Sequence, residues 1–156
     1  MGSAPYSGAY TERIASLADE RVRLPGGIWD QELLDQLYAG ALVYYHGHSV
    51  GGTNPSLLRA IGAGAAVDAF DVSFNREVLG DAGRYWTGAD DVARLVASAE
   101  ADPAAQAARG ELSRERAALY DWDEVADRYE ALCRELAASG PRSDRPSGRR
   151  AGIAPS

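Results

Sequence analysis

Two short runs of apolar residues, each followed by a helical pattern, limit most strongly what this chain can fold into. The first run is residues 41–45 (Ala-Leu-Val-Tyr-Tyr), and the second is residues 65–70, where only Asp68 is charged. A continuous apolar run predicts a strand buried on both faces, which is typical of parallel sheets covered by helices. Strands that alternate with helices therefore predict an α/β fold.

Other segments continue this alternation. Residues 21–24 alternate polar and apolar side chains, which predicts a short strand, and residues 84–86 predict a last one. Apolar spacing, capping residues and glycines predict helices at about 8–19, 31–39, 55–63, 76–79, 90–99, 103–120 and 122–139. Residues 1–139 are thus expected to form a partial Rossmann-like parallel sheet of about four strands, flanked by helices and followed by C-terminal helices.

The last segment, residues 140–156, has a different composition. It is rich in Pro, Gly, Ser and Arg, and its four Arg exceed its one acidic residue, Asp144. We expect a disordered basic tail. Such a tail can touch anionic lipid or nucleic acid, but a solvated tail is the simpler interpretation.

Charge and composition exclude several classes of protein. The net charge of −7 argues against general nucleic-acid binding, which depends on Lys and Arg neutralising phosphates. No signal-peptide pattern is visible, and no apolar run approaches the roughly 20 residues that a transmembrane helix needs. The single cysteine, Cys133, excludes an internal disulfide framework, and its place in a helical pattern predicts a buried thiol in a reducing compartment.

The most informative segment is residues 46–58, His-Gly-His-Ser-Val-Gly-Gly-Thr-Asn-Pro-Ser-Leu-Leu, between a predicted strand and a predicted helix. Ligands of open α/β sheets bind there, beyond the carboxyl ends of the strands. Gly51 and Gly52 let the backbone approach a ligand, while Asn54 and Pro55 suit the start of the helix. The first-turn N–H groups are expected to be free and, with the helix dipole, to bind a diphosphate. Taken alone, the glycine pair also fits a tight turn without a ligand.

Two histidines precede the glycine pair. His46 and His48 are two residues apart, so in a strand they face the same side. We expect them to form hydrogen bonds to sugar or phosphate. A metal pair is the alternative, but no third ligand is obvious and a zinc site usually needs three.

A second polar segment, residues 71–78, follows the next predicted strand and therefore reaches the same edge of the sheet. We expect residues 71–75 to form a loop in which Asn75 and backbone N–H groups meet the sugar or base. Arg76 can pair with phosphate. The alternative is that Arg76 and Glu77 are ordinary surface residues at a helix start.

In this order and about fifteen residues apart, the two segments resemble the C-terminal, donor-binding lobe of retaining bacterial GT-B glycosyltransferases. The closest resemblance is to rhamnosyltransferase-like enzymes of surface polysaccharide synthesis. The likeness extends over about residues 2–137, and its specific core is residues 51–58, Gly-Gly-Thr-Asn-Pro-Ser-Leu-Leu.

This resemblance implies binding of a nucleotide-diphosphate sugar, such as dTDP-rhamnose, without a metal or other cofactor. The acceptor would be a glycan or a lipid-linked saccharide, and the location the cytoplasm, with peripheral contact at the inner face of the membrane. The diphosphate-binding turn would fall on Gly51, Gly52, Thr53 and Asn54. Residues that face the donor sugar or nucleotide would be His46, His48, Arg59, Ser73, Phe74, Asn75 and Arg76. No catalytic residue is assigned, because such groups would lie mostly in an N-terminal lobe or on the substrate.

Two residues depart from the family pattern. Family members commonly have Glu, which bonds the donor ribose, where this chain has Arg59, and an arginine side chain has no acceptor. Asp68 interrupts a strand that should be apolar. A buried, unpaired carboxylate costs on the order of several kcal/mol, so Asp68 must be protonated or paired, for example with an arginine.

The start of the chain is a third departure. The family's C-terminal lobe begins with two strands that have no counterpart here, which suggests an N-terminally truncated lobe. If these strands are central, the strand at 21–24 is cut off from the others, and the chain is expected to be weakly stable or self-associating. The alternative function is a non-catalytic nucleotide-binding or interaction module. A dinucleotide-dependent oxidoreductase is disfavoured, because no Gly-x-Gly-x-x-Gly opens a βα unit.

Overall fold

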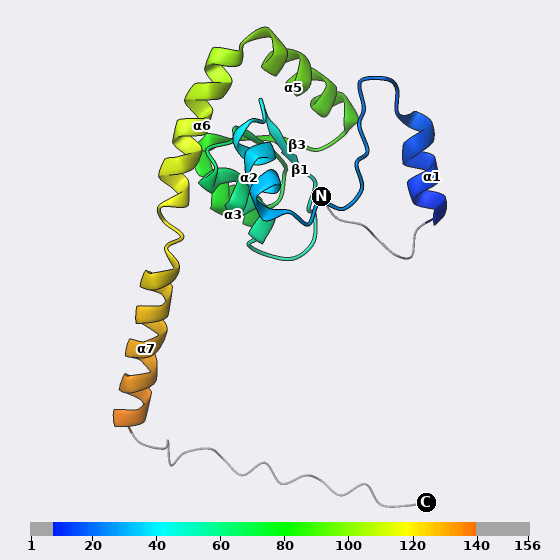
Figure 1. Cartoon of the computed structure of the whole chain (residues 1–156). Helices are drawn as coiled ribbons and strands as arrows, with labels where there is room; N and C mark the ends of the chain where they lie inside the picture. The colour runs from blue at the N-terminus through cyan, green and yellow to red at the C-terminus, as the bar shows by residue number, and fades with distance from the viewer. Residues whose placement is uncertain (1–7, 140–156) are drawn as a thin grey trace, which may run out of the picture. The chain divides into compact units, whose positions relative to one another are not determined.

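The computed structural model describes residues 8–139 and has the expected α/β architecture (Figure 1). Of the described residues, those from Gly8 to Leu119 belong to one compact unit, and α7 belongs to a second unit that begins at Tyr120. The elements of the first unit are α1 (Gly8–Leu17), α2 (Gln31–Ala39), β1 (Tyr44–His46), α3 (Pro55–Gly62), β2 (Val67–Phe70), α4 (Ser73–Leu79), η1 (Gly80–Ala82), β3 (Gly83–Trp86), α5 (Ala89–Ala101) and α6 (Pro103–Ala117).

The sheet of the described residues has three parallel strands in the order β1-β2-β3. Tyr44 is paired with Val67, and Val67 with Gly83, so the carboxyl ends of all three strands lie at the same edge. The expected parallel sheet is confirmed, but it has three strands rather than about four.

The strand expected at residues 21–24 does not form. Its backbone is engaged locally, because Val22 N donates to Asp19 O (3.0 Å) and Arg21 N donates to Asp19 Oδ1 (2.9 Å). Val22 and Leu24 are about half exposed. A strand is stabilised by a lateral partner, and no strand lies beside this segment in the described part of the chain, so a turn at 20–21 and irregular backbone at 22–24 replace it.

Helix starts follow the capping residues that the sequence offers. Asp30 Oδ1 accepts from Leu33 N (3.1 Å) before α2, and Asp102 Oδ1 accepts from Ala105 N (2.9 Å) before α6. Asp121 accepts from Asp123 N (2.8 Å) at the start of α7 (Trp122–Ala138) in the second unit. These bonds satisfy N–H groups that have no partner within the helix.

The core of the first unit lies between the sheet and helices α3, α4 and α6. Leu57, Ile61, Val67 and Leu79 are fully buried. Helix α6 approaches the backbone closely, since a Cβ atom at Gly110 would lie 2.3 Å from the carbonyl oxygen of Gly64. This contact requires glycine at position 110.

Asp68 lies in the middle strand and is fully buried, but it is not unpaired. Its Oδ1 accepts from Arg84 Nε (3.0 Å) and from Arg109 Nη2 (2.8 Å), and its Oδ2 accepts from Arg84 Nη2 (2.9 Å). The expectation of an arginine partner is therefore confirmed. Two guanidinium groups, from β3 and from α6, compensate one carboxylate.

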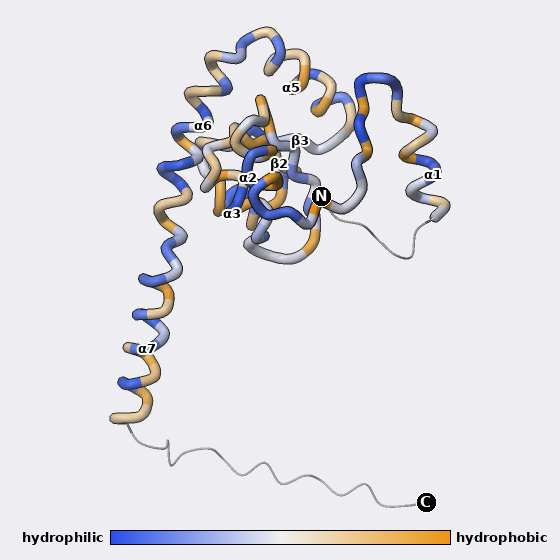
Figure 2. The backbone as a smooth tube through the Cα atoms, in the orientation of Figure 1, coloured by the Kyte–Doolittle hydropathy of each residue, from blue (hydrophilic) through white to orange (hydrophobic). Residues whose placement is uncertain are grey.

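Helix α7 alternates hydrophilic and hydrophobic residues along its length (Figure 2). The side chains of its apolar stripe, Trp122, Val125, Tyr129, Leu132 and Leu136, are all exposed. Cys133 is also exposed, so the expectation of a buried thiol is wrong. The helical spacing was interpreted correctly, but a helix buries its stripe only where another element covers it. The expected tail at 140–156 lies outside the described residues.

Candidate functional site

The loop of residues 47–53 connects the carboxyl end of β1 to α3, and all of its residues are exposed. Gly51 has φ +122°, a conformation that other residues rarely adopt. A Cβ atom at Gly51 or Gly52 would meet no atom within 4 Å. The loop therefore has open space beside it, and Gly51 is required for its backbone path.

Helix α3 begins as expected, with Asn54 as cap and Pro55 in its first turn. Asn54 Oδ1 accepts from Ser56 N (2.9 Å), and Leu57 N and Leu58 N donate to Asn54 O (3.0 and 3.1 Å). The expectation that the first-turn N–H groups are free is therefore wrong, because Asn54 already satisfies them.

Backbone N–H groups without a hydrogen-bond partner in the described structure lie in the residues just before the first turn of α3. Among the described residues, no hydrogen bond engages the N–H groups of Gly51, Gly52, Thr53 or Asn54. These four consecutive donors precede the positive end of the α3 dipole. Consecutive N–H groups at a helix N-terminus are a common anion-binding arrangement.

His46 and His48 do face the same side, and their rings stack with centroids 5.1 Å apart. His46 is buried, whereas His48 is exposed. The Nδ1 atom of His46 lies 3.3 Å from the hydroxyl of Tyr44, which in turn lies 3.2 Å from Ser56 Oγ. This chain of polar contacts fixes the end of β1 to the first turn of α3.

Burial, together with the nearby His48 ring, lowers the pKa of His46 to about 4. The ring is therefore neutral near pH 7 and brings no positive charge to the strand ends. In the described residues, its Nε2 atom has no hydrogen-bond partner.

The lowered pKa of His46 predicts a pH-dependent stability. Protonation is disfavoured in the folded state, so the stability present above the ordinary pKa of 6.5 is lost as the pH falls toward about 4. Between about pH 7.5 and pH 5 we expect a loss of roughly 2 kcal/mol from this group. Urea unfolding of the wild type and of His46→Gln at about pH 7.5 and about pH 5 measures this loss. The free energy of unfolding should fall less steeply with decreasing pH in the variant, because the variant lacks the imidazole. Equal slopes would contradict the prediction.

The segment expected to be a loop, residues 71–75, is partly helical, because α4 begins at Ser73. Ser73 is exposed and Phe74 is half-buried, so both can line a surface beside the strand ends. The sequence does not predict this helix start, because the cap residue, Val72, is a valine and makes no side-chain capping bond.

Asn75 is fully buried and joins the two loops at the sheet edge. Its Nδ2 atom donates to His48 O (3.0 Å) and to Phe70 O (2.9 Å). Its amide nitrogen is therefore a positioning group rather than a free donor for a sugar. Its Oδ1 atom has no partner within the described residues.

Arg76 is exposed at the same edge and is engaged by a neighbour. It pairs with Asp71 through two bonds (2.5 and 2.8 Å) and lies over the ring of Tyr85, 4.2 Å from its centroid. The Arg76 guanidinium lowers the pKa of Asp71. Contact with phosphate would require Arg76 to leave or share this carboxylate.

Arg59 points toward α2. Its Nε donates to Asp35 Oδ1 (2.6 Å), its Nη1 to Gln31 Oε1 (2.6 Å) and its Nη2 to Gln31 O (3.2 Å). This arginine fastens α3 to α2 through three of its five N–H donors. The structure therefore gives a packing reason for arginine at this position.

Among residues 8–139, no helix is both long and apolar enough to cross a bilayer. Within the same residues, no three His, Cys, Asp or Glu side chains are grouped so that they could hold a metal ion.

No protein-family model and no curated protein matches the chain. Among solved structures, the fold is similar to sucrose-phosphate synthase from Thermosynechococcus elongatus, with a TM-score of 0.77 and 28% sequence identity. The match covers 89% of this chain and 38% of that chain, so the chain spans well under half the length of this structure. The chain thus has the fold of a glycosyltransferase-like lobe of the GT-B type.

Proposed function

We propose that this GT-B-like lobe binds a nucleotide-diphosphate sugar, with the diphosphate at residues 51–54. The observation that supports the proposal is the set of four unused N–H donors in an exposed loop at the start of α3. Its position beyond the carboxyl ends of β1 and β2 is the usual ligand site of such sheets. The resemblance of residues 51–58 makes dTDP-rhamnose the first donor to assay, with a glycan or lipid-linked saccharide as acceptor.

In this proposal the loop assists departure of the nucleoside diphosphate. Fixed N–H donors and the α3 dipole stabilise the negative charge that develops on the leaving diphosphate. His48, Ser73 and Phe74 line the exposed side of the strand ends, where the donor sugar would lie. Asn75 holds the two loops together. No group of this chain is assigned as a catalytic base, and the binding needs no metal.

A binding module without turnover is the second candidate, and Arg59 favours it. An acceptor at this position would bond the donor ribose, but arginine has none, and three of its five N–H donors are engaged by Asp35 and Gln31. Donor binding without transfer to any acceptor, even with an N-terminal lobe supplied, would support this candidate.

Replacing Gly51 by valine is expected to weaken binding of dTDP at least about tenfold, because valine is strained at φ +122° and the loop donors would be displaced. Isothermal titration of the whole chain measures the dissociation constant. Gly62→Ala is the matched control, since a Cβ atom there meets nothing within 4 Å. Equal affinities of Gly51→Val and the control would refute the proposed diphosphate site.

A further inference from the structure

A chain of four polar side chains joins the start of α3 to the end of β1. Asn54 Oδ1 lies 2.7 Å from Ser56 Oγ, which in turn lies 3.2 Å from the Tyr44 hydroxyl. The same hydroxyl lies 3.3 Å from Nδ1 of His46. Each of these three contacts is a hydrogen bond only if one of its two atoms supplies a proton, and the number of protons available determines the direction of each bond.

The direction is fixed at the Asn54 end of the chain of bonds. Asn54 Oδ1 also accepts from Ser56 N (2.9 Å), which is the capping bond of α3 and requires the amide oxygen at this place. An amide oxygen only accepts, so Ser56 Oγ must donate its single proton to Asn54. Ser56 Oγ can therefore only accept in its contact with Tyr44.

The same direction then reaches the imidazole of His46. Tyr44 has one hydroxyl proton, and the contact with Ser56 needs it. The Tyr44 oxygen must therefore accept in its contact with His46, so Nδ1 of His46 carries a proton. The reverse order would leave two oxygen lone pairs facing each other between Tyr44 and Ser56. Because the His46 ring is neutral near pH 7, its other nitrogen, Nε2, carries no proton.

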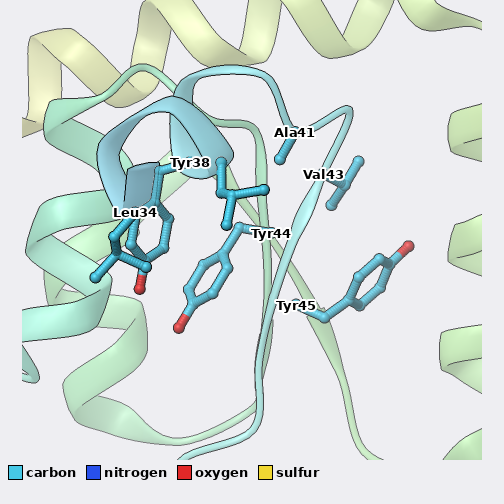
Figure 3. A pocket seen from close by; sticks show the side chains of 7 residues that line it. Leu34, Tyr38, Ala41, Val43, Tyr44 and Tyr45 are labelled. Atoms are coloured by element: carbon cyan, nitrogen blue, oxygen red, sulfur yellow. The ribbon is translucent and has the colours of Figure 1, made fainter. Parts of the chain in front are cut away.

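The neighbour of Tyr44 on α2 does not compete for its proton. Tyr44 projects to the same side of β1 as Tyr38, in the hollow beside α2, whereas Tyr45 projects to the other side (Figure 3). The rings of Tyr38 and Tyr44 meet edge to face, with centroids 5.2 Å apart. Burial, together with the charge and the hydrogen bond of the Tyr44 hydroxyl, raises the pKa of Tyr38 to about 12. A hydrogen bond raises the pKa of a phenol when the phenol is the donor, so Tyr38 donates to Tyr44.

We propose that this ordered chain of hydrogen bonds fixes His46 as the tautomer protonated at Nδ1, and that Tyr44 and Ser56 are positioning residues for its ring. The single N–H group of the neutral ring is then committed to Tyr44, so His46 brings no hydrogen-bond donor to the strand ends. The ring plane is held as well, and the exposed ring of His48 stacks on it with an interplanar angle of 12°. The ordering follows from bonds within the chain and does not depend on binding of a nucleotide sugar.

NMR of the whole chain with ¹⁵N-labelled histidine measures the tautomer directly, because a protonated and an unprotonated ring nitrogen give well separated signals. The chain has 2 histidines, so few signals need to be assigned. His48→Gln assigns them, because the ring that remains is that of His46. At about pH 7.5, well above the His46 pKa of about 4, the wild-type His46 ring is expected to carry its proton on Nδ1.

Ser56→Ala separates this ordering from simple packing. Ser56 acts on His46 through Tyr44, because no hydrogen bond or ring contact joins Ser56 to His46 in the described structure. Without the serine hydroxyl, the Tyr44 proton loses its acceptor and can turn to Nδ1 of His46, so the ring proton should move to Nε2. The ratio of the two tautomers is expected to change at least about tenfold. Ser16→Ala is the matched control, because it removes an exposed serine hydroxyl of α1, and it should leave the ratio unchanged.

Tyr44→Phe keeps the aromatic ring but removes the acceptor of the Nδ1 proton, so it should also lower the share of the Nδ1 tautomer of His46. A wild-type His46 ring that is protonated at Nε2 would overturn the proposal without any substitution. An unchanged tautomer ratio in Ser56→Ala would overturn it too, because the chain of bonds would then not determine where the ring proton lies.

Discussion

Replacing Asp68 by alanine is expected to destabilise the chain by roughly 3–5 kcal/mol, the usual effect of breaking a buried ion pair from one side. The carboxylate is fully buried, and the side chains of its two partners, Arg84 and Arg109, are also largely buried, with 25% and 15% of their surface exposed. Burial already lowers the pKa of Arg109, and Asp68 opposes that shift. Without Asp68, two adjacent guanidinium groups, one from β3 and one from α6, would remain with no counter-charge.

Urea unfolding at a fixed protein concentration measures this loss through the transition midpoint. Asp35→Ala is the matched control: it also removes an aspartate that pairs with an arginine, but at an exposed site, so it should change the midpoint little. Replacing all three residues together, Asp68→Leu with Arg84→Met and Arg109→Met, should recover much of the stability, because no charge is then left unpaired. An Asp68→Ala midpoint close to that of the wild type would show that the triad is not buried as described.

Gly110→Ala is expected to destabilise the chain by roughly 1–3 kcal/mol, although alanine favours a helix by about 1 kcal/mol relative to glycine. The added methyl group would lie 2.3 Å from the carbonyl oxygen of Gly64. That oxygen belongs to the backbone next to the start of the buried segment 65–69, so it cannot rotate away as a side chain would. Relief requires α6 to move off the sheet.

Thermal unfolding of Gly110→Ala and Gly62→Ala at one protein concentration separates packing from helix propensity. Both replace a helical glycine, but a Cβ atom at position 62 meets nothing within 4 Å. Gly62→Ala should therefore be neutral or slightly stabilising, while Gly110→Ala lowers the midpoint. Equal shifts in the two variants would exclude the close contact between α6 and Gly64.

The elements with local signals were predictable from the sequence. Asp30, Asn54 and Asp102 each bond an N–H group two or three residues ahead, so the helix start depends only on neighbours in the chain. Runs of apolar residues predicted that strands occur near β1 and β2, although β1 covers only residues 44–46 of the region expected at 41–45 and β2 only residues 67–70 of 65–70. Their alternation with helices predicted the parallel sheet. The same local reasoning located the loop at 51–54 beside the strand ends.

Local signals failed where a distant partner decides the outcome. The alternation at residues 21–24 is compatible with a strand, but no neighbouring strand is present in the described structure. The first turn of α4 has no capping side chain, and it is secured by Asn75, which bonds the backbone of His48 27 positions away. The donors expected to be free at α3 are a separate failure with a local cause, because Asn54, two to four residues away, already accepts from them.

By itself, therefore, the sequence determined the α/β class, most helix boundaries and the position of the candidate site, because these depend on periodicity and on bonds between near neighbours. Only the tertiary structure decided the role of each polar residue. Asp68 is compensated by arginines 16 and 41 positions away, and Arg59 is engaged by α2. A side chain's charge and donors are visible in the sequence, but which of them remain free for a ligand depends on partners that folding alone brings within reach.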